Sequence, residues 1–214
     1  MDRSKETTNT WNKIADLYAE KFMDLELYND SYDLFCELIS EAHPNILDIG
    51  CGPGNITKYL LKKRPDFNML GIDNAPNMIR LAKKHSPTAA FQVMDAKRII
   101  SLPPGFHGMM CGFCIPYLSK KEVSKLLSDS FHLLQNNGIL YLSFLDDDYA
   151  KSGYKTGSTG DKVYFYYYTT SFLVDALRKH HFDILHRMEF DYKRSENTSE
   201  KHTVLIAKKV SAKV

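Results

Sequence analysis

An acid and three glycines alternate over residues 48–54, in the order Asp-Ile-Gly-Cys-Gly-Pro-Gly. The apolar run before them, residues 45–50, predicts a short strand, and residues 56–63 have the pattern of a helix. A glycine-rich loop between a strand and a helix lies at the carboxyl end of that strand, where open α/β sheets bind their ligands. Glycines let the backbone approach such a ligand closely, because no Cβ stands in the way.

The glycine spacing and the acid discriminate between ligands. A dinucleotide fingerprint, G-x-G-x-x-G, needs its third glycine at position 55, which here is Asn55, while Gly54 lies one residue early. A carboxylate at Asp48 would repel a pyrophosphate and attract an ammonium or a sulfonium. The loop therefore favours a cationic ligand without phosphates. S-adenosylmethionine is such a molecule, with an α-ammonium, a sulfonium and a ribose that offers two hydroxyls.

Asp73 is an independent indication of the same ligand. It ends the apolar run 68–73, which predicts a second strand, and it follows the last glycine by about 20 residues, the interval at which an acid meets ribose hydroxyls. A carboxylate at this position can accept hydrogen bonds from both hydroxyls. The alternative is that Asp73 only caps the helix that begins at Pro76.

These features resemble the class I S-adenosylmethionine-dependent methyltransferases, whose first motif has the form acid-x-glycine-x-glycine-x-glycine. By element order the resemblance extends from Trp11 to Lys208 and is to small-molecule members of the methyltransferase-domain 11 or 25 type. It implies that S-adenosyl-L-methionine binds here and leaves as S-adenosyl-L-homocysteine. It also implies cofactor contacts from the first helix, the glycine loop and the ends of the next three strands, namely Tyr18, Asp48, Gly50, Cys51, Gly52, Asp73, Asn74, Met78, Asp95, Ala96 and Phe113.

Three of these implied contacts have a structural alternative. Asp95 follows the expected third strand, where an aspartate is often only a turn or cap residue. Phe113 could belong to the core. Trp11 and Tyr18 are seven residues apart on one helical face, a spacing that simple packing also explains.

Neither a catalytic base nor a metal site is assigned from the sequence. Methyl transfer is expected to be an in-line displacement at the sulfonium methyl, in which alignment contributes most and no side-chain base is obligatory. The three consecutive acids 146–148 cannot easily converge on one octahedral ion. Cys111 and Cys114 have no second pair to complete a zinc site, so buried packing is expected. Position alone suggests four acceptor-lining tyrosines, Tyr28, Tyr117, Tyr154 and Tyr166.

The remaining elements should position this loop in an α/β fold. Strands alternating with helices predict a Rossmann-like, doubly wound, seven-stranded, mostly parallel sheet with an antiparallel edge strand. Residues 10–22 and 32–41 predict an N-terminal helical lid, and residues 146–162 a long loop. The runs 182–192 and 202–208 have no helix between them and should pair antiparallel. The other expected elements are strands at 90–94, 108–113, 139–145 and 163–169, and helices at 76–85, 120–134 and 171–181.

Composition fits one domain without nucleic-acid or membrane partners. The chain has 214 residues, 28 Lys and Arg against 26 Asp and Glu, and 43% hydrophobic residues. We expect a single methyltransferase domain, 1–214, made of a helical cover (1–45), a cofactor-binding core (46–145), a substrate-side loop and strand (146–168) and a C-terminal helix with the antiparallel strand pair (169–214).

The near-neutral charge gives no case for nucleic acid, and no apolar segment has membrane-spanning length. The N-terminal residues have no apolar signal segment, and four cysteines in a chain that can build its own core indicate reduced thiols. We therefore expect a cytoplasmic monomer or homodimer that acts on a small-molecule methyl acceptor.

Two alternative functions stay open on the sequence. An NAD-dependent oxidoreductase is opposed by the misplaced third glycine and by Asp48. A non-catalytic, S-adenosylmethionine-binding regulatory protein would keep the same pocket and lose turnover, so the sequence does not separate it from an enzyme.

Overall fold

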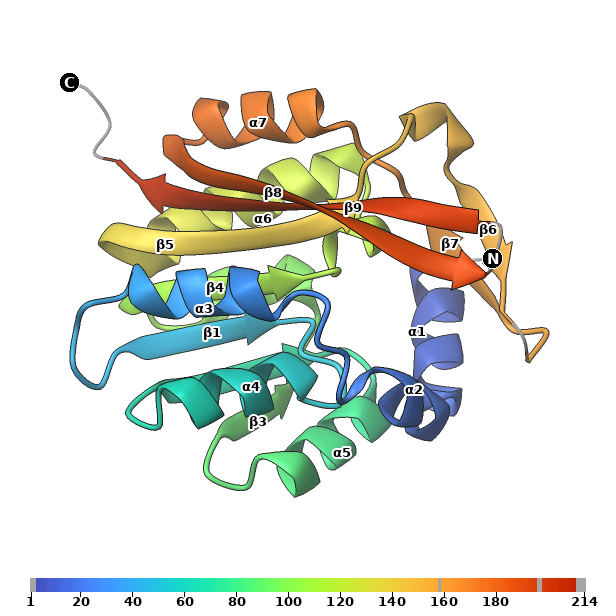
Figure 1. Ribbon diagram of the computed structural model, residues 1–214, viewed down its shortest axis with the longest axis horizontal. Helices are drawn as coiled ribbons and strands as arrows, with labels where there is room; N and C mark the ends of the chain where they lie inside the picture. The colour runs from blue at the N-terminus through green and yellow to red at the C-terminus, as the bar shows by residue number, and fades with distance from the viewer. Residues whose placement is uncertain (1–2, 158, 196–197, 211–214) are drawn as a thin grey trace.

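The computed structural model describes residues 3–157, 159–195 and 198–210. A seven-stranded sheet runs through the molecule in the order β3-β2-β1-β4-β5-β9-β8 (Figure 1). Its strands are β1 (Asn45–Ile49), β2 (Asn68–Asp73), β3 (Ala90–Val93), β4 (Phe106–Gly112), β5 (Leu134–Leu145), β8 (Phe182–Ser195) and β9 (Thr198–Lys209). The chain order reverses between β1 and β4, which places the ligand-binding switch point of the sheet there.

The expected parallel sheet with an antiparallel edge is confirmed. Strand β1 pairs in parallel with both β2 and β4, and β4 pairs in parallel with β5. Strand β9 lies between β5 and β8 and runs antiparallel to both. The short connection between β8 and β9 leaves no room for the crossover helix that a parallel pair needs.

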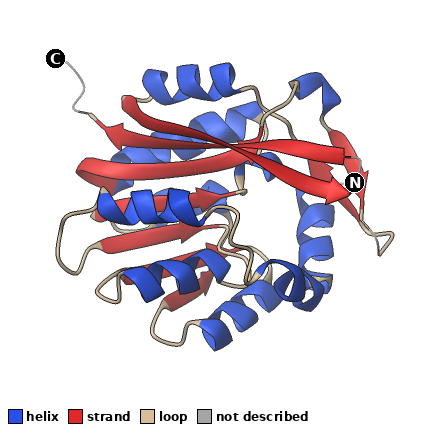
Figure 2. Ribbon diagram, viewed as in Figure 1, coloured by secondary structure: helices blue, strands red, loops and turns tan. Residues whose placement is uncertain are grey.

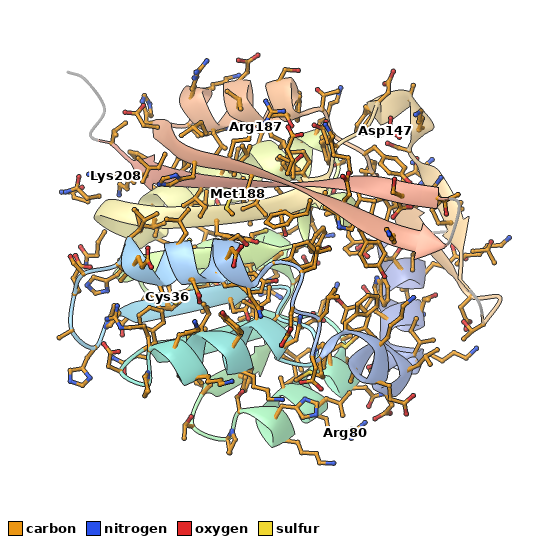
Figure 3. All side chains as sticks on the ribbon, viewed as in Figure 1. Cys36, Arg80, Asp147, Arg187, Met188 and Lys208 are labelled. Atoms are coloured by element: carbon orange, nitrogen blue, oxygen red, sulfur yellow. The ribbon has the colours of Figure 1, made fainter. Side chains whose placement is uncertain are left out.

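Helices cover both faces of this sheet (Figures 1 and 2). One face carries α3 (Asn29–Glu37), α4 (Asn55–Lys63) and α5 (Pro76–His85), and the other carries α6 (Lys120–Leu133) and α7 (Thr170–Lys179). Side chains fill the layer between α3 and the sheet, where Cys36 is buried (Figure 3). The apolar strands, buried on both faces, hold the edge of the sheet that carries the glycine loop in a fixed position.

A separate cover lies at the end toward which β1 and β4 point (Figure 1). It consists of α1 (Arg3–Lys13), α2 (Ala15–Phe22) and a two-stranded sheet of β6 (Gly153–Thr156) and β7 (Lys162–Phe165). The described residues also form three short 3₁₀ helices, η1 (Ala96–Ser101), η2 (Ile115–Tyr117) and η3 (Tyr149–Lys151).

Several expectations about this cover are corrected. The apolar face of residues 10–22 belongs to two helices, because the backbone leaves helical geometry at Ile14, so three helices precede β1. The expected loop 146–162 contains η3 and β6. The expected strand 163–169 is shorter and lies outside the main sheet, since β7 pairs with β6. Strand β6 has no apolar alternation from which its pairing could be inferred.

Candidate active site

A cavity lies at the switch point of the sheet and holds about 870 Å³ of empty space, part of it open to solvent. Its wall combines side chains of the cover, the glycine loop and the ends of β2, β3 and β4. These are Ser4, Thr7, Thr8, Trp11, Tyr18, Gly50, Gly52, Asp73, Asn74, Met78, Met94, Asp95, Ala96, Lys97, Gly112, Phe113, Cys114, Tyr117 and Leu118.

The glycine loop forms one wall because its backbone adopts left-handed conformations. Gly50 and Gly52 have φ angles of 70° and 53°, which side-chain-bearing residues rarely adopt. A Cβ on Gly50 would lie 2.9 Å from the Cβ of Cys114, so the wall would have to move. A Cβ on Gly52 would meet only the ring of Tyr18, at 3.8 Å, and would take up space between the loop and the cover.

Asp73 presents a fixed carboxylate beside this loop. One of its oxygens accepts the backbone N–H of Gly52 at 3.1 Å, and the other accepts that of Ala75 at 2.8 Å. Burial raises the pKa of Asp73 above its usual value, while these backbone N–H groups favour the charged form. Each oxygen keeps a lone pair for a ligand. Asp73 therefore orders the entry into α5 and also offers a double acceptor to the cavity.

Asp48 lies behind the cavity wall. Its side chain is almost fully buried, one oxygen accepts the Thr57 hydroxyl at 2.6 Å, and the other has no hydrogen-bond partner. Burial raises the pKa of Asp48 to about 7, and the Asp73 carboxylate contributes to the shift. The Asp73 carboxylate gives this end of the cavity a negative field that attracts a cation, and Asp48, whose protonated form is favoured by burial, adds to that field only when it ionises.

The opposite end of the cavity is formed by the residues after β3. The Asp95 carboxylate accepts the backbone N–H of Lys97 at 2.9 Å and so caps η1. The Lys97 ammonium lies 3.3 Å from Asp95 and 3.5 Å from Glu122. Among the described residues that line the cavity, Lys97 is the one cation, and carboxylates already neutralise it.

Helix α1 closes the cavity through hydrogen bonds on two sides. The Thr8 hydroxyl accepts from the Asn74 side chain at 2.8 Å, which joins α1 to the loop after β2. Thr7 accepts a backbone N–H of β7 at 3.0 Å, and Thr10 donates to a backbone carbonyl of β7 at 2.7 Å. The helix therefore bridges the core of the domain and the β6–β7 hairpin.

Aromatic rings surround the glycine-loop end. The Trp11 ring stands edge-on to Tyr18 and Tyr117, with centroid distances of 5.5 and 5.6 Å. Burial raises the pKa of Tyr18 to about 12, so its hydroxyl remains neutral. Phe113 closes the corner with a left-handed φ of 52°, and its backbone N–H donates to the Ser143 hydroxyl at 2.9 Å. A bulky residue at such a φ is strained, which is common at functional sites.

Most residues expected from the sequence meet in this cavity. Those that line it are Tyr18, Gly50, Gly52, Asp73, Asn74, Met78, Asp95, Ala96, Phe113 and Tyr117. Asp48 and Cys51 lie buried outside the lining.

Three of the four tyrosines expected to line an acceptor site lie elsewhere. Tyr154 is 44% exposed and donates to Glu6. Tyr166 stacks on Tyr149, and Tyr28 is buried beneath Phe113. The placement of Tyr154 and Tyr166 follows the corrected hairpin, because the path of residues 146–168 depends on the pairing of β6 with β7. Tyr28 lies at the start of α3 and packs into the core.

The cover supplies lining residues that sequence reasoning missed. Ser4, Thr7 and Thr8 lie on α1, on a polar surface that a surface helix would usually turn to solvent. Met94, Lys97, Gly112, Cys114 and Leu118 adjoin residues that were expected in the site. Closeness to the strand ends could have indicated this second group, whereas nothing in the sequence marks the first.

The consecutive acids 146–148 diverge. Asp146 bonds to Thr170, Asp147 pairs with Lys151, and Asp148 caps η3. No group of three or more His, Cys, Asp or Glu side chains is arranged to hold a metal ion anywhere in the described ranges. Over those same residues, no helix has the length and apolar character needed to cross a bilayer.

A doubly wound α/β sheet with a glycine-loop cavity at its switch point defines a class of domains that bind nucleotides or nucleosides. Within that class, residues 46–138 match a family described as "Methyltransferase domain". The match covers less than half of the chain, so this part of the chain is similar to that methyltransferase family.

Curated relatives match only part of the chain. Trans-aconitate 2-methyltransferase of Methylobacterium nodulans is 34% identical over 84 residues, which cover 39% of this chain and 32% of the relative. The chain spans about half or less of the length of the curated relatives that it matches first.

Solved structures match the fold over most of the chain. An S-adenosylmethionine-dependent methyltransferase from Methanosarcina mazei has a TM-score of 0.71 at 21% identity, covering 81% of this chain and 96% of that one. The 1,6-didemethyltoxoflavin-N1-methyltransferase of Burkholderia thailandensis has a TM-score of 0.74 at 16% identity, covering 97% and 88%. At these identities the likeness establishes the fold.

Proposed function

We propose that the protein transfers a methyl group from S-adenosyl-L-methionine to a small-molecule acceptor. The observation that carries the proposal is the junction of Gly52 and Asp73, where a 3.1 Å hydrogen bond holds a double acceptor beside a wall without a Cβ. This arrangement accommodates a diol next to a group that approaches the backbone closely. The ribose of the proposed donor is such a diol.

The residues of the cavity fit this donor at three places. Asp73 would hold the ribose hydroxyls. A bound ammonium or sulfonium would favour ionisation of the buried Asp48 carboxyl, which has one oxygen unpartnered, and the carboxylate would then attract that cation. Asp95 and Ala96 would hold the adenine. When bound, the donor supplies a methyl group already activated on a sulfonium.

The protein contributes alignment and exclusion of water. Trp11, Tyr18 and Tyr117 form a rigid corner beside the glycine loop, and α1 is tied down on both sides of the cavity. Holding two reacting atoms in line can contribute up to about 7–11 kcal/mol without any side-chain base. A closed cover keeps water away from the reacting atoms.

The charges of the cavity support a neutral acceptor. Trans-aconitate, which the name of several relatives gives as their acceptor, carries three carboxylates. The single cation of the described lining, Lys97, is already paired with Asp95 and Glu122. A polycarboxylate would therefore lose hydration without gaining a partner. We infer that this chain acts on an uncharged, aromatic or amphipathic acceptor.

The proposal also covers the cellular location, the domain organisation and the oligomeric state of the protein. The four cysteines are free, as expected in the reducing cytoplasm. We infer one domain in which residues 1–45 and 146–168 cover the core, acting as a monomer or a homodimer without a nucleic-acid partner.

Titration calorimetry with S-adenosylhomocysteine and with NADH tests the cofactor. We expect binding of the thioether and no binding of NADH; the reverse would favour the oxidoreductase and end the proposal. A methyl-labelled donor incubated with a small-metabolite extract then tests turnover. Thioether binding without label transfer would identify a non-catalytic cofactor-binding protein.

A further inference from the structure

One lysine of the cavity wall connects three parts of the molecule. Lys97 lies in η1, two residues after Asp95, and both side chains line the cavity. The Lys97 ammonium lies 3.3 Å from Asp95 and 3.5 Å from Glu122 of α6. It also donates a hydrogen bond to the Ser4 hydroxyl of α1 at 3.2 Å. The side chain therefore links the end of β3, helix α6 and the cover.

Both carboxylates around Lys97 are also held by backbone N–H groups. One oxygen of Asp95 accepts the backbone N–H of Lys97, and the other faces the ammonium. Glu122 accepts the backbone N–H and the hydroxyl of Ser119, both at 2.7 Å. An ammonium has three donors, and here they face three fixed partners. The orientation of the Asp95 carboxylate is therefore set at both of its oxygens.

The charges of this group stabilise one another. Although burial opposes the effect, the Asp95 and Glu122 carboxylates raise the pKa of Lys97. Burial likewise opposes ionisation of Glu122, yet the hydrogen bonds from Ser119 and the charge of Lys97 lower its pKa. Lys97 and Glu122 are therefore charged at neutral pH. Asp95 keeps lone pairs that a ligand in the cavity can use.

This arrangement distinguishes between two purine bases. The exocyclic amino group of adenine donates hydrogen bonds, whereas the exocyclic oxygen of hypoxanthine only accepts them. A carboxylate held as Asp95 is held accepts from the amino group and repels the oxygen. The Lys97 ammonium is the cationic donor at this end, and its donors already face Ser4 and two carboxylates. Hypoxanthine would therefore lose hydration without gaining a partner.

We propose that Lys97 is a positioning residue that selects an adenine base through Asp95 and couples binding of that base to closure of α1 through Ser4. The inference rests on the proposed methyl transfer, because the base belongs to the donor. An amino group that donates to Asp95 competes with the ammonium for the same carboxylate. The ammonium then interacts more strongly with Ser4, and α1 is held more tightly over the cavity.

The selection is tested with S-adenosylhomocysteine and S-inosylhomocysteine, which carries hypoxanthine in place of adenine. Titration calorimetry measures both dissociation constants in the wild type, in Lys97→Met and in Lys63→Met. Lys63 pairs with Asp33 at 2.7 Å and does not line the cavity, so it is the matched control. We expect the wild type to prefer the adenine thioether by about a hundredfold, and this preference to fall by about tenfold in Lys97→Met alone.

Hydrogen exchange in α1 tests the link to the cover. Each thioether is added at a saturating concentration, and exchange is followed by mass spectrometry. In the wild type we expect S-adenosylhomocysteine to slow exchange in α1 more than S-inosylhomocysteine does. In Ser4→Ala, which removes the hydroxyl that the ammonium reaches, the two thioethers should slow exchange in α1 equally.

The outcomes separate this inference from the function on which it rests. Failure of the wild type to bind S-adenosylhomocysteine contradicts the methyltransferase itself. Binding of that thioether with the same preference in the wild type and Lys97→Met, or with no preference in the wild type, overturns the role of Lys97. If Lys97→Met does not fold, Ser4→Ala decides, because it leaves the ion pairs in place. A difference between the two thioethers that persists in α1 of Ser4→Ala contradicts the proposal.

Discussion

Two carboxyl groups near the glycine loop differ because their surroundings differ. Asp73 accepts two backbone N–H groups and faces the cavity, whereas Asp48 has one hydroxyl partner and is buried behind it. Backbone donors stabilise the charged form, and burial without enough donors stabilises the protonated form. The proposed donor would therefore contact Asp73 directly, whereas Asp48 would act on it only through its charge.

Replacing Asp73 tests the ligand contact. Asp73→Asn is expected to weaken S-adenosylhomocysteine binding by about 1–3 kcal/mol, because an amide cannot accept as many hydrogen bonds as a carboxylate. Titration calorimetry measures the change. Asp16→Asn, on the exposed part of α2, is the matched control and should bind as the wild type does. Equal affinities in a folded Asp73→Asn would remove the ribose assignment.

Asp48 should make stability depend on pH. Its pKa in the folded protein, about 7, is above the model value of 3.8, so the folded state binds more protons between these values and the free energy of unfolding falls as pH rises from about 4 to about 7. Asp48→Asn should remove this pH dependence. Its free energy of unfolding at pH 8 should exceed that of the wild type by on the order of 2–4 kcal/mol. Urea unfolding at each pH, followed by the fluorescence of the single tryptophan, Trp11, measures the free energy of unfolding of the wild type and of the variant. Parallel pH profiles would contradict the assignment.

At the scale of elements, α1 contributes more to the cavity and its cover than its sequence predicts. Its polar residues bond to the loop after β2 on one side and to the backbone of β7 on the other. The hairpin and the helix therefore stabilise each other, and neither has a large apolar face of its own against the sheet. Opening of this cover should control how fast a ligand enters and leaves.

Thr10→Val tests the contact between α1 and β7. The substitution keeps the shape of a nearly buried side chain and removes its 2.7 Å bond to the Lys162 carbonyl, which should cost about 1–3 kcal/mol locally. We expect faster hydrogen exchange in α1 and faster dissociation of S-adenosylhomocysteine, measured by mass spectrometry and stopped-flow fluorescence. Thr88→Val, in the exposed turn before β3, is the control. Unaltered exchange in α1 would show that the hairpin does not restrain it.

At the scale of the whole molecule, the cavity joins the cover to the core. A ligand there contacts α1, α2 and three strand ends at once, so its binding free energy should add to the stability of the whole domain. The sheet contributes the strand ends and the glycine loop, and the cover contributes the wall made by α1 and α2.

S-adenosylhomocysteine is therefore expected to raise the midpoint of thermal unfolding. At about 100 times its dissociation constant the stabilisation should be about 2.7 kcal/mol. Trp11, which lines the cavity, should change its fluorescence over the same concentrations. Calorimetric scans with and without S-adenosylhomocysteine measure the shift of the unfolding midpoint. Scans with NADH at the same concentration are the control. A shift with NADH alone would contradict the cofactor assignment.

The sequence by itself determined the parts of this protein that depend on local patterns. The order Asp-Ile-Gly-Cys-Gly-Pro-Gly between a buried strand and a helix located the ligand loop, because such glycines are needed where the chain turns with positive φ. The alternation of strands and helices determined the doubly wound sheet, because buried parallel strands are apolar throughout. Asp73 could be found by its distance from the loop.

Only the tertiary structure decided what covers that loop. The approach of α1 depends on hydrogen bonds between residues about 150 positions apart, such as Thr10 with Lys162. The break at Ile14 and the pairing of β6 with β7 have no signal in the local pattern either. Short polar segments like these have no periodic pattern, and their conformation is decided by the partner they meet.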